Sequence, residues 1–133
     1  PVQLIRLQEY FPPHNSGFGE QARLVVTGQA EWETAWRRVW EGHSPVPAAP
    51  AVDFEREVVL VAAMGSRPNG GHHIQVKQAA AQADRVVVRV VETSPGKACF
   101  TTAAFTEPVD VVKLPRTPLP IEFQTVKAVH ECD

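Results

Sequence analysis

The segment EVVLVAAMGSRPNGGHHIQVKQA, residues 57–79, carries the pattern that decides the fold class of this chain. Its first part, Val58–Met64, is an apolar stretch with the length of a β-strand. Its last part, His72–Ala79, alternates between apolar and polar residues, which is typical of a strand with one buried face. Between them, Pro68–Gly70 is strong turn chemistry, because Pro fixes φ while Asn and Gly tolerate positive φ. The segment therefore predicts a β-hairpin with its tip at these turn residues.

Outward from this hairpin, short apolar or alternating stretches recur along the chain, separated by Pro and Gly. We expect further strands at Leu4–Leu7, Ala22–Thr27, Arg85–Glu92, Cys99–Phe105, Val109–Leu114 and Ile121–Val129. Many short strands with frequent turn signals favour an antiparallel β-sandwich or a partly open barrel over an α/β fold.

One helix is expected at Gly28–Gly42, near the N-terminus. Trp32, Trp36, Val39 and Trp40 recur at helical spacing and form one apolar face. Three tryptophans could form a platform for a ligand. We favour a core role, because a stripe of large aromatic residues usually docks a lone helix onto a sheet. The fold class predicted is thus mainly β, with one N-terminal α-helix packed against the sheet.

The length of 133 residues fits one domain covering residues 1–133, and 44% hydrophobic residues suffice for a core. A formal net charge of −2 provides no electrostatic footprint for nucleic acid or an anionic membrane. No apolar run has the length of a transmembrane segment. Because the chain begins at Pro1 rather than Met, we expect that a signal or anchor segment was removed or the end was trimmed.

The two cysteines, Cys99 and Cys132, match neither a zinc-site spacing nor a C-x-x-C redox pair. They could be two buried thiols or one disulfide. We favour the disulfide, because Cys132 is the second-last residue and chain ends fray unless they are tied down. Disulfides persist in oxidising compartments, so this pairing indicates an exported protein that is periplasmic, on the cell surface or secreted.

Candidate catalytic and metal-binding residues are weak. The five histidines are His14, His43, His72, His73 and His130. Adjacent residues on a regular strand point to opposite faces, so the 72–73 pair should not ligate one metal together. No serine lies in G-x-S-x-G and no phosphate-binding glycine loop is present. We therefore expect no catalytic residues, no metal site and no cofactor, with an enzyme of unrecognised type as an alternative.

The stretch Val59–Ile74 resembles the signature of the PrcB C-terminal-like family, whose members carry a Val-rich strand, G-x-x-P-T-G-G-Y and an apolar strand. Asn69 stands where Thr is usual and His72 where Tyr is usual. The order of other features agrees from about residue 22 to residue 132, including the Trp-containing helix and the Cys99 region.

The resemblance implies an exported bacterial domain that associates with a surface protease complex and supports it. It suggests a non-catalytic binding or stabilising module with a protein partner. Loops on rigid sandwiches often carry binding, so the candidate contact residues are those of the tip. They are Arg67, Pro68, Asn69, Gly70, Gly71, His72 and His73. The same tip loosely resembles a loop of chagasin-like cysteine-protease inhibitors, which makes inhibition an alternative function.

A disulfide between Cys99 and Cys132 would close a loop of about 34 residues and stabilise the fold by roughly 3–4 kcal/mol. Mass spectrometry of native protein, with and without reductant, should therefore show a mass gain of two hydrogens only after reduction. A count of two free thiols in native material would contradict the pairing.

Overall fold

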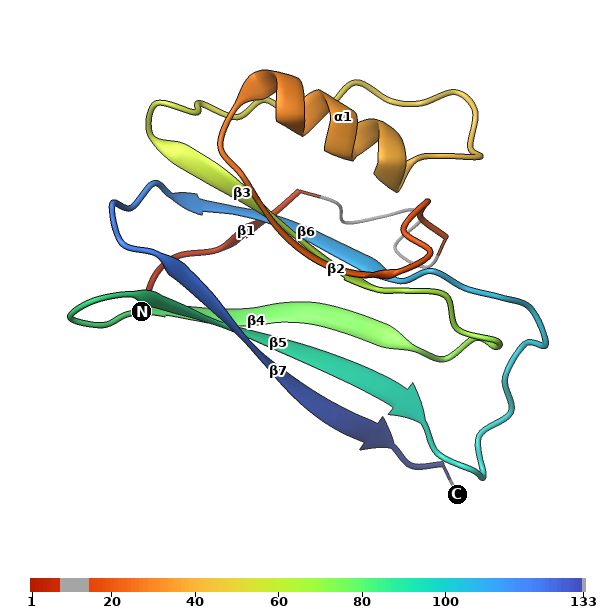
Figure 1. Ribbon diagram of the computed structural model, residues 1–133. Helices are drawn as coiled ribbons and strands as arrows, with labels where there is room; N and C mark the ends of the chain where they lie inside the picture. The colour runs from red at the N-terminus through yellow and green to blue at the C-terminus, as the bar shows by residue number, and fades with distance from the viewer. Residues whose placement is uncertain (8–14, 133) are drawn as a thin grey trace.

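Two sheets and one helix form three stacked layers in the computed structural model, which describes residues 1–7 and 15–132 (Figure 1). The elements are β1 (Ile5–Arg6), β2 (Gln21–Val26), α1 (Gln29–Val39), β3 (Glu57–Met64), β4 (His73–Ala81), β5 (Val86–Pro95), β6 (Val109–Pro115) and β7 (Ile121–His130). The predicted class, a β-sandwich with one N-terminal helix packed against it, is confirmed. No closed barrel is formed by the part of the chain described here.

The strands are divided between a four-stranded sheet, in the order β1-β6-β3-β2, and a three-stranded sheet, in the order β4-β5-β7. All pairs are antiparallel except β5 and β7, which run parallel over the whole of β7. The expected antiparallel pairing is therefore found for every strand pair but this one. The chain enters β7 from β6 in the other sheet, and that crossing permits the parallel direction.

Strand β3 is the centre of the fold, because both of its faces are buried. The residues at odd positions, Val59, Val61 and Ala63, pack against α1, and those at even positions pack against the three-stranded sheet. An apolar run with no polar face is what a strand covered on both sides requires. The longest apolar stretch of the sequence therefore separates two hydrophobic cores.

The helix covers the outer face of the four-stranded sheet through its tryptophans, as expected (Figure 1). Trp32 is fully buried and Trp36 nearly so. Their indole N–H groups donate to the carbonyl oxygens of Pro50 at 2.9 Å and Pro47 at 2.8 Å. Each buried indole thus satisfies its polar atom and fastens the proline-rich connector after the helix. The helix itself ends at Val39, before the predicted Gly42.

Two further expectations are wrong. Residues 65–72 do not form a hairpin tip, because β3 and β4 belong to different sheets. Residues 99–105 form no strand but an irregular loop between β5 and β6. An isolated β-bridge between Arg67 and Thr106 instead pairs the β3–β4 connection with the β5–β6 connection.

A buried carboxylate joins the two sheets at one end. Asp110 on β6 is 5% exposed, and both of its oxygens accept hydrogen bonds from the Arg6 guanidinium, at 2.8 and 2.9 Å. It also accepts the backbone N–H of Val76, next to a β-bulge in β4. Because the carboxylate is fully satisfied, its burial fixes the position of the bulge rather than leaving an unpaired charge.

No helix in the described residues is long and apolar enough to cross a membrane.

Replacing Trp32 by Ala should lower the free energy of unfolding by about 3–5 kcal/mol, because the change leaves a cavity and an unpaired carbonyl at Pro50. Urea denaturation measures this loss. Val46→Ala, in the exposed connector, should change the stability by less than about 0.5 kcal/mol. Equal effects of the two substitutions would contradict the role given to the tryptophan.

Candidate functional site

The predicted contact residues lie in the connection that carries the chain from β3 to β4, from one sheet to the other. Pro68, Gly71 and His73 are exposed, whereas Arg67, Asn69 and His72 are partly buried and Gly70 is buried. The connection is therefore a packed segment with some exposed positions, not a free tip.

A second segment, residues 96–106, lies alongside this connection and is hydrogen-bonded to it. Asn69 Nδ2 donates to Thr101 Oγ1 at 3.0 Å, and Thr106 Oγ1 donates to the Asn69 carbonyl at 2.9 Å. The Gly70 N–H donates to the Thr102 carbonyl at 3.0 Å. A Cβ at Gly70 would collide with Thr102 Oγ1, so any larger residue there would displace the Thr102 side chain. We call residues 67–73 and 96–106 together the tip surface.

The tip surface presents two aromatic side chains to solvent. Phe100 is fully exposed, at 105% of its reference area, and Phe105 is 74% exposed. The sequence did not indicate these two residues as contact residues, because its pattern predicted a strand over Cys99–Phe105. Their spacing was a signal against a strand with one buried face. Phe100 and Phe105 are five positions apart, so they would point to opposite faces of any regular strand.

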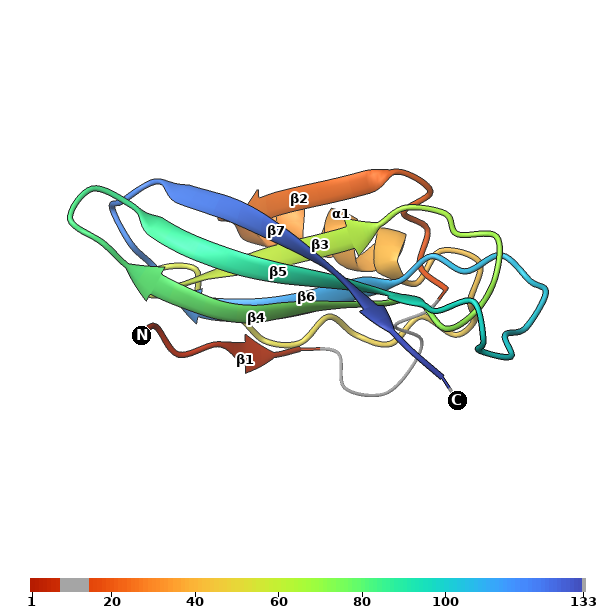
Figure 2. The same ribbon diagram turned by 90° about the horizontal axis from the view of Figure 1, so that it is seen from below.

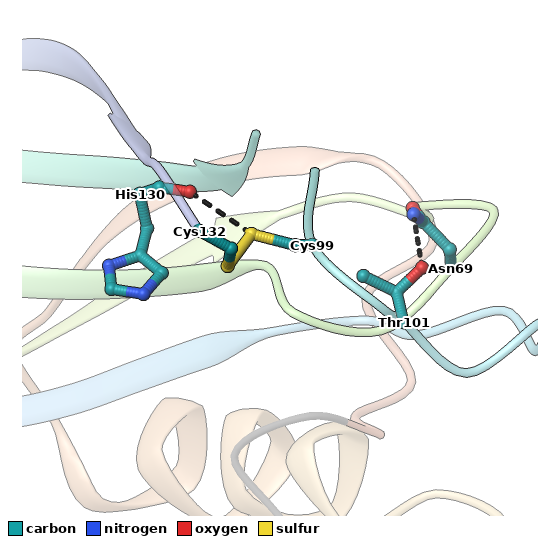
Figure 3. Close-up of a disulfide and its surroundings, with 5 residues drawn as sticks. All are labelled: Asn69, Cys99, Thr101, His130 and Cys132. Atoms are coloured by element: carbon teal, nitrogen blue, oxygen red, sulfur yellow. Dashed lines mark hydrogen bonds between the residues drawn. A yellow bond between two sulfur atoms is a disulfide. The ribbon is translucent and has the colours of Figure 1, made fainter. Parts of the chain in front are cut away.

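The predicted disulfide between Cys99 and Cys132 is present, with the two Cα atoms 5.0 Å apart (Figure 3). It joins the start of the exposed loop to the chain just beyond β7. The Gly96 N–H donates to the His130 carbonyl at 2.8 Å and continues the β5–β7 pairing up to the disulfide. The loop is thus fixed at Cys99 by a covalent bond and at Thr106 by the pairing with Arg67.

Arg67 is held in place by a buried acid, Glu92 on β5, which is 3% exposed. One oxygen of Glu92 lies 4.0 Å from the Arg67 guanidinium, and the other lies 2.6 Å from that of Arg23. Gln21 donates to the same carboxylate at 3.1 Å. The cluster neutralises a charge between the sheets and orients the first residue of the tip surface.

His72 contacts Asn69 from within the tip surface. Its Nε2 lies 2.8 Å from Asn69 Oδ1, so Nε2 carries the proton and donates it to that oxygen. Its Nδ1 is buried without a hydrogen-bond partner among the described residues. Desolvation, followed by the nearby charges of Arg67 and His73, lowers the pKa of His72 below its usual 6.5. The ring is therefore kept neutral at neutral pH.

Among the other histidines that the structure describes, His130 borders this surface, because its carbonyl oxygen accepts the Gly96 N–H at 2.8 Å. His14 lies outside the described residues, and His43 Nε2 lies 2.6 Å from the carbonyl oxygen of Asn15, near the helix. Within residues 1–7 and 15–132, no three His, Cys, Asp or Glu side chains are close enough to hold a metal ion. Taken together, the geometry supplies exposed aromatic rings and hydrogen-bonding groups on a fixed backbone.

Residues 58–115, which run from β3 to β6 and include the whole tip surface, match the family model described as PrcB C-terminal. This match confirms the family resemblance that the sequence signature predicts. No curated protein and no solved structure matches the chain.

The depressed pKa of His72 predicts that the folded protein loses stability as the pH falls below about 6.5. The unfolded chain binds a proton there more readily than the folded chain does, so acidification favours unfolding. Thermal denaturation between about pH 5 and 7 should show a flatter pH dependence for His72→Gln than for the wild type. Val46→Ala, which removes no titratable group, should keep the wild-type slope. Identical slopes for wild type and His72→Gln would refute the assignment.

Proposed function

Because residues 58–115 match the PrcB C-terminal family model, we propose that this chain is a non-catalytic, exported module that binds another protein, such as a protease complex, through the tip surface. The observation that carries the proposal is the exposure of Phe100 and Phe105 on a loop whose two ends are fixed.

Exposed aromatic residues of this kind favour an interface. Burying a Phe side chain contributes roughly 1.5–3 kcal/mol of free energy. In the isolated chain neither Phe100 nor Phe105 makes this contribution, because both are exposed. Aromatic side chains are enriched at the centres of protein interfaces, where a few residues supply most of the binding energy. The other exposed apolar residues, such as Val46 and Val129, are aliphatic and lie on other elements.

The fixed backbone of the loop supports the same function. Binding by a flexible loop loses affinity to the ordering of its backbone and side chains. Here the disulfide, the Arg67–Thr106 pairing and the hydrogen bonds of Asn69 have already ordered the loop. The arrangement therefore favours a preformed contact surface.

The disulfide also supports export and the absence of thiol catalysis. It uses both cysteines of the chain, so neither is available as a nucleophile, and such a bond persists in oxidising compartments.

The test is quantitative cross-linking in the native host, followed by identification of the partner. Replacing both Phe100 and Phe105 by Ser should reduce the cross-linked partner by on the order of tenfold or more, because two buried aromatic anchors are lost. Val46→Ser removes one exposed apolar side chain from the connector and should leave the yield unchanged.

Two results would contradict the proposal. One is an unchanged partner yield for the double Phe variant and for a variant with Asn69→Ala and His72→Ala. The other is inhibition of papain-like or subtilisin-like proteases at micromolar concentrations, which would favour the chagasin-like alternative.

A further inference from the structure

Strand β7 ends the three-stranded sheet, and its outer edge is unpaired within the described residues (Figure 2). Val86 donates to the Pro120 carbonyl at one end of the β5–β7 pair, and Gly96 donates to the His130 carbonyl at the other. In a parallel ladder, these two bonds direct the even-numbered residues of β7 towards β5. The N–H and C=O groups of the odd-numbered residues therefore point away from the sheet. These residues are Ile121, Phe123, Thr125, Lys127 and Val129.

Of the features that usually prevent strand addition, the edge has only charged side chains, those of Glu122 and Lys127. Natural edge strands are kept short, interrupted by Pro or bulged, or they carry several charges. Strand β7 has ten residues, pairs with β5 in unbroken register, and contains neither Pro nor Gly. Most of its residues are exposed, and Lys127 is the only charged side chain among those with free backbone groups.

A hollow of about 310 Å³ lies beside the start of this edge. Its apolar lining includes Val25 of β2, Val58 of β3, Leu119 and Ile121. Among the described residues that line the hollow, Arg116 alone is charged. In Figure 2, β2 lies on the same side of the molecule as β7, so the hollow is located between the two edge strands.

We propose that the free edge of β7 binds an extended segment of another protein as a fourth strand of this sheet. Only an extended backbone matches a row of alternating N–H and C=O groups at this spacing. A residue directly opposite Ile121 points to the same face of the sheet and reaches the hollow, so it is apolar. A partner residue opposite Lys127 points to the same face as the lysine side chain. An acidic residue at that position pairs with its positive charge. The partner therefore carries an apolar and an acidic residue six positions apart.

The charge of Lys127 argues against a second copy of this chain as the occupant. In antiparallel pairing of two β7 strands, residues with free backbone groups face one another. Every such residue of β7 is apolar, a hydroxyl or Lys127 itself, so no carboxylate of a second β7 can meet Lys127.

This site is separate from the tip surface. The tip surface uses side chains of the β3–β4 and β5–β6 connections, whereas the β7 edge uses backbone groups. A variant carrying Phe100→Ser and Phe105→Ser should therefore keep strand addition, so the two proposals fail independently.

The probes are two synthetic peptides, ETTTVTI and its reverse ITVTTTE, which place Ile opposite Ile121 and Glu opposite Lys127 in antiparallel and parallel pairing. Binding of one peptide should slow amide hydrogen exchange at the odd-numbered residues of β7, as measured by NMR. Thr125→Pro removes an N–H that β5 does not use, so the variant should fold and lose binding.

Charge exchange supplies the second measurement. Lys127→Glu should weaken binding of the Glu peptide by about two- to fivefold and strengthen binding of the same peptide with Lys in place of Glu. Arg89→Glu, an exposed charge on β5, should change neither affinity.

Three outcomes would overturn the inference: no binding of either peptide at millimolar concentration, binding that Thr125→Pro leaves intact, or affinities that Lys127→Glu does not change. Protection of the same amides without peptide, together with a dimer in analytical ultracentrifugation, would instead identify a second copy as the occupant.

Discussion

The structure depends on the burial of β3 on both faces. Its side chains alternate between the core beneath α1 and the core between the two sheets, so one strand supplies both. Any polar residue within Val58–Met64 would be buried without a partner, whichever way it pointed. Two surfaces cover the two faces of β3: the tryptophan face of α1 and the valine-rich strands of the three-stranded sheet.

Between the sheets, the fold tolerates two buried carboxylates, and both are matched by arginine. Asp110 is paired with Arg6 on the β6 side of β3, and Glu92 is paired with Arg23 and Arg67 on the β2 side, at the same end of the sandwich. Buried ion pairs contribute little net stability, because desolvation offsets the attraction. Their effect is specificity, since each carboxylate is satisfied only when the sheets stack in this register. Arg67 also belongs to the tip surface, so the stacking of the sheets and the orientation of the tip surface are coupled.

The disulfide connects the two surfaces for which binding is proposed. Cys99 begins the loop that presents the phenylalanines, and Cys132 follows the strand with the free edge. The ends of β5 and β7, which precede these two cysteines in the chain, lie side by side (Figure 1). The covalent bond therefore keeps the start of the loop and the end of β7 in a fixed position relative to each other.

The sequence by itself determined the positions of most strands, the helix and its buried face, because each rests on a local period of side chains. It also indicated the cysteine pairing and the family signature at Val59–Ile74. Only the tertiary structure decided how the strands divide into two sheets, that β7 runs parallel to β5, and that residues 99–105 form a loop. Those outcomes depend on contacts between residues far apart in the chain, which no local pattern encodes. For the same reason, the exposed phenylalanines and the free edge of β7 became visible only when the sheets were assembled.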